Sequence, residues 1–379
     1  MAIKICKFTR KNMQISLIWP REFEEINPGK WYYIRIVIFL ITYGVFPFCT
    51  FLHAVVVIHN NLDIRISEDI GAVVSNIGIS YMAIIYVQQQ NQIAYLLKDL
   101  SDFKDFGKPP FFEEENKRLN FWSICTFIYP TCGASLYNLS KILEKSECNK
   151  INEENGLPAT CGFIFPIWVP FNINYFPLFH IMLISTWFCT TMFVRLHLSI
   201  SYNAFEIAHH IILRIKHLNG MIITCFDCQD YKISRQKFTT CVLYYKQILD
   251  LSNRLNQSFS SIMFVHFTMT SAVCGCLEKQ FVDGEYVGGF IHLVGWIISL
   301  FIASVGGQDL VNASQSISEA IWSSKWYLAD IRLKKDVLFM LMRSQKDLHM
   351  SVGSFGVLSY AFFVSVLKMS YSILAMLTS

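Results

Sequence analysis

The chain has 379 residues, of which 53% are hydrophobic and only 16% are charged, and its mean hydropathy is +0.38. Soluble domains usually carry about a quarter charged residues, so this composition excludes an ordinary soluble protein and is typical of a chain solvated by lipid. The formal net charge of +4 also excludes a strongly basic surface of the kind that binds nucleic acid.

Seven apolar runs are long enough to cross a bilayer, which takes about 20 helical residues. The first six contain no Asp, Glu, Lys or Arg. In chain order the runs are 36–58, 70–87, 121–139, 175–194, 259–277, 287–305 and 352–378. We therefore expect an all-α membrane protein with seven transmembrane helices.

The distribution of basic residues predicts the orientation of these helices. The N-terminal segment 1–35 has no apolar core and no cleavage site of a signal peptide. Twenty-four Lys and Arg residues fall in the tail up to residue 30 and in 88–120, 199–257 and 307–350. Five fall in 59–69, 140–174 and 278–286. The positive-inside rule then places the N-terminus in the cytosol and the C-terminus outside. This is the reverse of a G-protein-coupled receptor, and no G protein is expected as a partner.

Cysteines offer one candidate disulfide. Cys148 and Cys161 lie in the predicted outer loop 140–174, where an oxidising exterior permits a bond, and two free thiols are the alternative. Cys225 and Cys228 have the spacing of metal ligands, but no second pair accompanies them, so we expect no metal site. No catalytic arrangement and no cofactor motif is recognisable, and an enzyme is not expected.

Residues 307–350 are too polar to span and have amphipathic helical spacing. The residues at helical spacing are Ile317, Ala320, Ile321 and Ser324, followed by Leu338, Leu341 and Met342. We expect a cytosolic anchor layer that packs between subunits, below a membrane bundle formed by 36–306. Helices that lie on the lipid headgroups are the alternative.

The last region, 351–379, carries a polar stripe along one helix face. At 3.6 residues per turn the stripe consists of Ser351, Ser354, Leu358, Ala361, Ser365, Lys368, Ser372, Ala375 and Ser379. Ionisable residues inside a membrane usually face a bundle interior or water. The stripe therefore predicts a pore wall repeated around an oligomer axis. Close helix packing by small residues, or a lysine that reaches the outer surface, would also explain it.

The C-terminal third resembles the insect odorant receptor family. The similar segments are "GGQDLVNASQSISEAIWSSKW", "FMLMRSQKDLHMSVGSFGVLS" and "VLKMSYS". The most specific features are Trp326, the run Arg343-Ser344-Gln345 and the run Lys368 to Ser372, in that order near the chain end. The tail lacks the Thr-Tyr…Gln-Phe signature of the related gustatory receptors, and the chain is shorter than the family's co-receptor.

The resemblance implies a ligand-tuning subunit of a heterotetrameric, ligand-gated, non-selective cation channel. Its partners would be olfactory co-receptor subunits, a small volatile odorant and membrane lipid, in the plasma membrane of sensory neurons. The alternatives are a gustatory-type receptor channel and a secondary transporter. A transporter would predict internal repeats, which the sequence lacks.

The resemblance also implies the site residues. It places the apolar gate at Met376, with Ser379 one turn further out and with Ser365, Lys368 and Ser372 on the pore side. We further hypothesise that Lys368 points toward a seam between helices or subunits. An odorant pocket in the outer half of the bundle would be lined by Ile77, Ser80, Tyr81, Gly133, Tyr137, Phe179, His180, Leu183, Phe267 and Thr270. Among these, His180 is the polar group best suited to select ligands.

Overall fold

The computed structural model describes residues 3–19, 30–59, 66–155, 160–165, 167–227, 230–282 and 286–378. Over these ranges the chain forms helices and two isolated β-bridges but no strand, so the expected all-α class is confirmed. The α-helices are α1 (Lys7–Ile15), α2 (Lys30–His59), α3 (Ile66–Leu100), α4 (Phe112–Leu143), α5 (Lys145–Asn155), α6 (Leu178–Ile223), α7 (Tyr231–Val282), α8 (Tyr286–Ser323), α9 (Ile331–Ser344) and α10 (Tyr360–Thr378), with a 3-10 turn at Trp326–Leu328.

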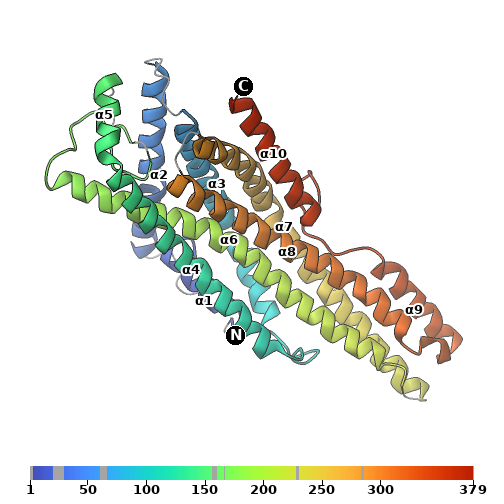
Figure 1. The fold of residues 1–379 in the computed structure, drawn as a ribbon. Coiled ribbons are helices and arrows are strands. Elements are labelled where there is room, and N and C mark those ends of the chain that lie inside the picture. The colour runs from blue at the N-terminus through green and yellow to red at the C-terminus, as the bar shows by residue number, and fades with distance from the viewer. Residues whose placement is uncertain are drawn as a thin grey trace.

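Three long helices, α6, α7 and α8, run side by side along an elongated bundle (Figure 1). α8 pairs with α6, and α3 pairs with α7. α4 lies against α6 and α8, α2 lies beside α3, and α10 lies against α7 and α8. The loop between α6 and α7 and the helix α9 lie at one end of the bundle, whereas α5 and the C-terminus lie at the other (Figure 1).

The core follows from the helical spacing of aliphatic residues on α6 and α7. On α6, Leu196, Ile200, Ile207 and Ile211 recur every four or seven residues and are fully buried. On α7 the fully buried series is Ile248, Leu251, Leu255, Phe259 and Ile262. These two stripes face the interior, so the long helices are held together by apolar side chains over most of their lengths.

Among the described residues, six helices are long and apolar enough to cross a membrane by length and composition: α2, α3, α6, α7, α8 and α10. On α2 only 18% of the apolar window is buried, and side chains such as Val37, Ile41 and Phe48 are exposed. Lipid is the natural solvent for such a face. α4 contains the expected run 121–139 but is less apolar, because Ser, Thr, Tyr and Asn interrupt it. The seventh crossing therefore stays a prediction.

Several helices extend well beyond the apolar runs from which they were expected. Residues 178–194 of the run 175–194 belong to α6, and the run 259–277 belongs to α7; these helices have 46 and 52 residues. α8 continues without a break through the boundary expected at residue 306. Hydropathy identifies only the apolar portion of a helix, whereas packing against neighbouring helices stabilises its polar extension.

The last helix begins at Tyr360, so the expectation of helical geometry from Ser351 onward is wrong. Residues 351–359 form a tight loop in which Val352 N–H donates to the carbonyl of Gly356 at 2.9 Å. Gly353 and Gly356 have φ values of +54° and +153°, which an α-helix cannot contain and which glycine adopts easily. Two glycines three residues apart thus end the polar stripe on its N-terminal side.

Candidate ligand-binding cavity and terminal helix face

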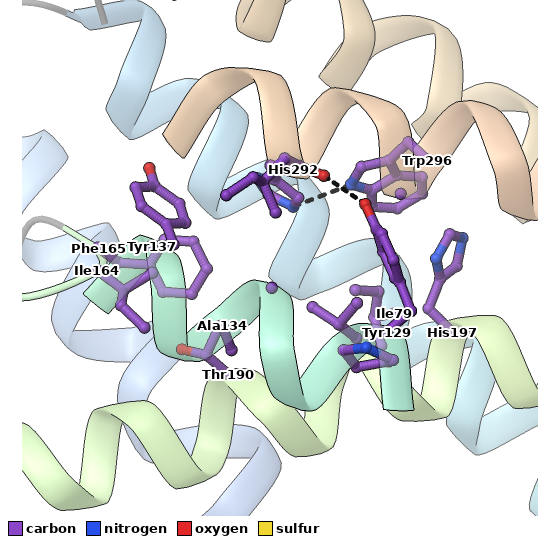
Figure 2. A pocket seen from close by; sticks show the side chains of 15 residues that line it. Ile79, Tyr129, Ala134, Tyr137, Ile164, Phe165, Thr190, His197, His292 and Trp296 are labelled. Carbon is purple, nitrogen blue, oxygen red and sulfur yellow. Dashed lines mark hydrogen bonds between the residues drawn. The ribbon is translucent and has the colours of Figure 1, made fainter. Parts of the chain in front are cut away.

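A cavity lies between α3, α4, α6 and α8 and encloses about 530 Å³ of empty space including its open mouth (Figure 2). Its walls are mainly aromatic and aliphatic. They consist of Ile79, Tyr129, Pro130, Gly133, Ala134, Tyr137, Ile164, Phe165, Thr190, Val194, His197, Ile291, His292, Gly295 and Trp296. This lining suits a small, largely apolar ligand.

Glycines on α8 let two tyrosines of α4 lie against its backbone. A Cβ atom at Gly288 would come within 2.0 Å of the Tyr137 ring, and one at Gly295 within 3.3 Å of the Tyr129 ring. The Tyr129 hydroxyl donates to the carbonyl of Ile291 at 2.7 Å. Both rings are therefore fixed by the α8 backbone, and they hold the cavity between α4 and α8 in shape.

A small polar group lies at one end of the cavity. Trp296 Nε1–H donates to Nε2 of His292 at 3.0 Å, one helical turn away (Figure 2). A neutral imidazole that accepts at Nε2 carries its proton on Nδ1. The His197 ring packs on Trp296 with 4.0 Å between ring centroids. The arrangement can therefore offer one N–H donor to an oxygen atom of a ligand inside an otherwise apolar chamber.

A second, smaller cavity of about 250 Å³ adjoins the first between α2, α3 and α6. The two cavities share Phe165 and Thr190 as lining residues. Asn76 lies in the smaller one, and its Nδ2 atom is buried without a hydrogen-bond partner in the described part of the chain. A ligand longer than the first cavity would meet this amide next.

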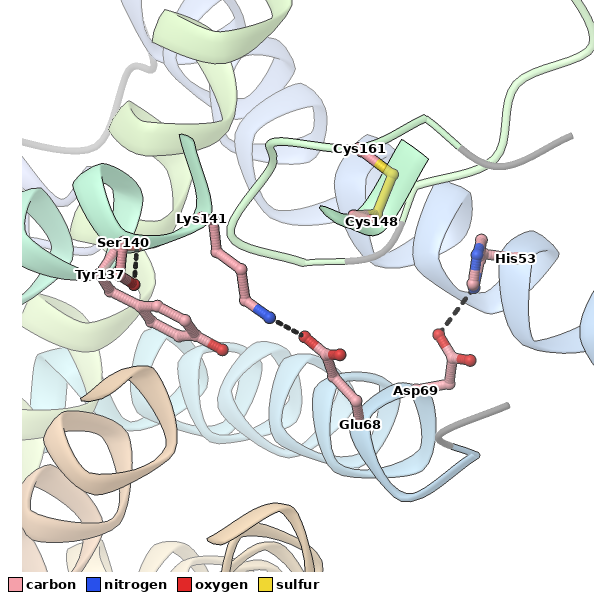
Figure 3. A network of polar contacts seen from close by, with 8 residues as sticks. All are labelled: His53, Glu68, Asp69, Tyr137, Ser140, Lys141, Cys148 and Cys161. Carbon is pink, nitrogen blue, oxygen red and sulfur yellow. Dashed lines mark hydrogen bonds and ion pairs between the residues drawn. A yellow bond between two sulfur atoms is a disulfide. The ribbon is translucent and has the colours of Figure 1, made fainter. Parts of the chain in front are cut away.

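Polar contacts tie together the helices at the bundle end that carries α5 (Figure 3). Lys141 of α4 donates to Glu68 of α3 at 3.0 Å, and both side chains are mostly buried. His53 of α2 contacts Asp69 of α3 at 2.8 Å. Because Lys141 lies one turn beyond Tyr137, this network fixes α4 close to the cavity wall.

A disulfide joins Cys148 of α5 to Cys161, with 5.9 Å between the Cα atoms. The sequence left open a disulfide or two free thiols, and the structure contains the disulfide. It anchors the segment that contributes Ile164 and Phe165 to the cavity. The wall formed by this segment is thus held covalently to α5 (Figure 3).

The structure brings two of the predicted ligand residues, Gly133 and Tyr137 of α4, into the cavity. The predicted residues of α3 lie outside it. Ile77 and Tyr81 are 54% and 53% exposed on the outer face of the bundle. The Ser80 hydroxyl donates to a backbone carbonyl of α2 at 3.2 Å. The residue of α3 that lines the cavity is Ile79, which lies between Ile77 and Tyr81 in the sequence.

The predicted residues at the start of α6 form a separate cluster. Phe179 packs on Phe163 with 5.3 Å between ring centroids. Lys145 Nζ lies 3.4 Å from the centroid of the Phe179 ring. Leu183 packs in the same small apolar cluster. His180 is exposed beside it. These residues cover the segment around the disulfide and do not line the cavity.

The predicted residues of α7 contact other helices. The Phe267 ring lies 4.6 Å from that of Phe362 on α10. Thr270 is fully buried and donates to the carbonyl of His266 at 2.7 Å. Both lie away from the cavity lining, and Phe267 connects α7 to the terminal helix.

The sequence interpretation missed most of the cavity. The unpredicted polar and aromatic lining residues are Tyr129, Phe165, Thr190, His197, His292 and Trp296. One signal was available: the sixth apolar run contains a histidine and a tryptophan four residues apart, which places both on one helix face. Polar side chains in a charge-free membrane helix rarely face lipid.

The terminal helix α10 exposes one face and buries the other. Val366 and Ser370 are buried against the bundle. The predicted pore residues on the exposed face are Ser365, Lys368, Ser372 and Met376, whereas Ser379 lies outside the described residues. Within α10 the expected stripe therefore lies on the surface that the chain's own bundle leaves uncovered. The apolar Val364, Met369 and Tyr371 are exposed there too, whereas Leu358, expected in the stripe, precedes the helix and is buried.

Comparison with known proteins identifies the family. A model of the 7tm odorant receptor family matches residues 85–371. Odorant receptor 85b of Drosophila melanogaster is 28% identical over 152 residues, or 39% of each chain. Odorant receptor 85c of the same organism is 22% identical over 313 residues, or 79% of each chain. The chain thus spans little more than a third of the length of the first of these relatives.

The fold is also similar to that of a solved structure. The olfactory receptor OR5 of Machilis hrabei aligns with a TM-score of 0.80 and 14% identity over 98% of this chain and 96% of that one. Its complex with eugenol aligns with a TM-score of 0.78 and 13% identity over 98% and 97%. With six apolar helices long enough to span among its described residues, the chain is a multi-pass membrane protein. The matched family consists of receptors, in agreement with the expectation that the chain is not an enzyme. Since the match covers most of its length, the chain belongs to the 7tm odorant receptor family.

Proposed function

We propose that this protein is the ligand-tuning subunit of an odorant-gated, non-selective cation channel. It assembles with co-receptor subunits into a heterotetramer in the plasma membrane of sensory neurons. Seven helices cross the membrane, with the N-terminus in the cytosol and the C-terminus outside. The observation that carries the proposal is that one chain combines a largely apolar cavity with a terminal helix whose polar positions are uncovered.

The chemistry of the cavity supports a volatile ligand with few polar groups. Its lining is aromatic and aliphatic, and its polar groups belong to two histidines, two tyrosines, one threonine and Trp296. A molecule with one hydrogen-bond acceptor would satisfy the Nδ1–H of His292 and bury the rest of its surface against Trp296 and Ile79. The Machilis receptor was solved with eugenol, a small aromatic phenol. A small aromatic ligand would fit the aromatic lining of this cavity.

The uncovered face of α10 supports a pore at a subunit axis. Hydroxyl and small side chains recur along that face together with Lys368. A polar stripe exposed to lipid would be costly, whereas copies around an axis would line an aqueous path. Met376 lies near the end of this face and would form the apolar constriction.

Exposed apolar residues at the opposite end of the chain support assembly. The region around the end of α8 and along α9 exposes Trp322, Tyr327, Leu328, Ile331, Phe339 and Met342, each between 59% and 73% accessible. Apolar patches of this kind on helices too polar to span are typical of protein interfaces. Neighbouring subunits would cover them and form the cytosolic anchor layer.

Whole-cell current in cells that express this chain with and without co-receptor tests the proposal across a panel of volatiles. We expect current only with both subunits and a suitable volatile. We expect His292→Ala to change the ranking of ligands and His349→Ala, an exposed histidine beside α9, to leave it unchanged. A changed ranking for His180→Ala instead would place the ligand at the start of α6. Absence of current with surface expression intact would refute the proposal.

A further inference from the structure

A buried cluster of potential metal ligands lies away from the cavity, where α1 contacts α4 and α6. It consists of Cys6, directly before α1, and Glu206 and His210 on α6. The thiol, a carboxylate oxygen and a ring nitrogen lie within 4.8 Å of one another, and all three residues are buried. Glu206 and His210 are four residues apart, so they share one face of α6.

The Cys6 thiol is a hydrogen-bond partner of the Glu206 carboxylate, but three other polar atoms of the cluster lack a partner among the described residues. Neither ring nitrogen of His210 has a hydrogen-bond partner among the described residues, and the same holds for Oε1 of Glu206. The other carboxylate oxygen, Oε2, accepts a hydrogen bond from Thr9 at 2.6 Å. Buried polar atoms nearly always have partners, because each one left alone costs about 1–3 kcal/mol. An imidazole with two unpaired nitrogens beside a carboxylate and a thiol points to a missing ligand.

The backbone at Cys6 is held in an unusual conformation. Its φ of +54° lies in the left-handed region, and its side chain is fully buried. Such a conformation is uncommon for a residue other than glycine, and it is often associated with functional sites. Here it turns the thiol toward α6 at the start of α1.

We propose that Cys6, Glu206 and His210 bind a zinc ion that fastens the N-terminal segment to α6. A thiolate, an imidazole and a carboxylate form a ligand set that Zn²⁺ accepts, with a water molecule as the fourth ligand. The thiolate and the carboxylate balance the two charges of the ion, which a buried site requires. Ligand atoms in a tetrahedral zinc site lie about 3.5 Å apart, so the distances between the three ligand atoms would have to shorten by about 1 Å.

The surrounding residues provide a second shell for this site. Thr9, which donates to Oε2 of Glu206, is itself hydrogen-bonded to Ser123 of α4 at 2.8 Å. The ion would therefore connect α1 and α6 directly and α4 through these hydroxyls. Its loss should loosen the N-terminal segment without removing any residue of the ligand cavity.

Cobalt binding to the purified full-length chain tests the proposal. After removal of metal with a chelator, Co²⁺ should bind at one equivalent per chain and produce a thiolate-to-cobalt charge-transfer band. Zn²⁺ should displace it. Cys6→Ser should abolish the band, and His210→Gln should weaken binding at least tenfold. Cys225→Ser and His209→Gln are matched controls, because both residues are buried and neither belongs to the cluster.

The measurement on the unaltered chain decides the outcome even if a variant does not fold. Wild-type protein with native helix content that binds no cobalt would overturn the proposal. So would a cobalt spectrum that persists unchanged in folded Cys6→Ser. A stoichiometric band that depends on Cys6 and His210, and that the two control variants retain, would support it.

Discussion

The contact between Gly288 and Tyr137 gives a sharp test of the cavity. In the variant Gly288→Ala, the new methyl group would lie 2.0 Å from Cε2 of the Tyr137 ring and 2.4 Å from Cδ2. Ordinary contact begins near 3.4 Å, so the ring must move by about 1.4 Å or α8 must shift away. Tyr137 lines the cavity, and either movement changes its volume.

The cost can be bounded from the size of this overlap. Overpacking of a well-packed site typically costs about 1–3 kcal/mol. If this free energy destabilises the ligand-bound state relative to the free state, the half-maximal ligand concentration rises about 5-fold to 150-fold. We expect this rise in whole-cell dose–response measurements with co-receptor, together with a lower melting temperature of the purified chain.

The neighbouring glycine is a matched control. A Cβ atom at Gly289 would have its nearest neighbour, Gln280 Oε1, at 3.7 Å. Gly289→Ala should therefore be neutral or stabilise the helix by about 0.5–1 kcal/mol. The double variant Gly288→Ala/Tyr137→Ala should recover part of the lost stability relative to the sum of its single variants, since the clash is gone. Equal behaviour of Gly288→Ala and Gly289→Ala would refute the reasoning.

Three further changes test other parts of the structure. Lys141→Met leaves the mostly buried Glu68 carboxylate without its ion pair and should lower the free energy of unfolding by roughly 3 kcal/mol; Lys141→Met/Glu68→Leu should be closer to wild type in thermal denaturation. Cys148→Ser opens a loop that spans 13 residues and should cost about 3 kcal/mol, seen as faster proteolysis of the segment before α6; equal cleavage rates would contradict this. Lys368→Glu should leave relative cation permeability unchanged if the side chain points to a seam, and altered permeability with intact assembly would place it in the pore.

The sequence predicted well those features that depend on a single helix. The face of α8 formed by Ile317, Ala320 and Ile321 is buried, as is Ser324 directly after the helix, in agreement with their spacing. The polar face of α10 is likewise a property of 3.6-residue periodicity, so it can be predicted without knowledge of the neighbouring helices. The start of α10 was misplaced because the stripe pattern carries no information on the φ angles of Gly353 and Gly356.

Features that depend on which helices meet could not be predicted in the same way. On α9 the expected apolar positions included Leu338 and Met342, but both are exposed, and Val337 and Met340 are buried in their place. The helix has apolar side chains on more than one face, and only the arrangement of its neighbours selects between them. The cavity was incompletely predicted for the same reason, because α4 and α8 are far apart in sequence.

The arrangement of α8 connects the cavity to the terminal helix. Trp296 lines the cavity, and Phe301 lies five residues further, about 7.5 Å along the same helix. The Phe301 ring contacts that of Phe363 on α10 at 5.4 Å, while Phe267 of α7 contacts Phe362 at 4.6 Å. A helix moves as a rigid body over such a distance, so a ligand that shifts α8 at Trp296 would also shift its aromatic contacts with α10. A ligand that binds one position of α8 more tightly than another therefore biases the position of α10, which is the thermodynamic requirement for gating.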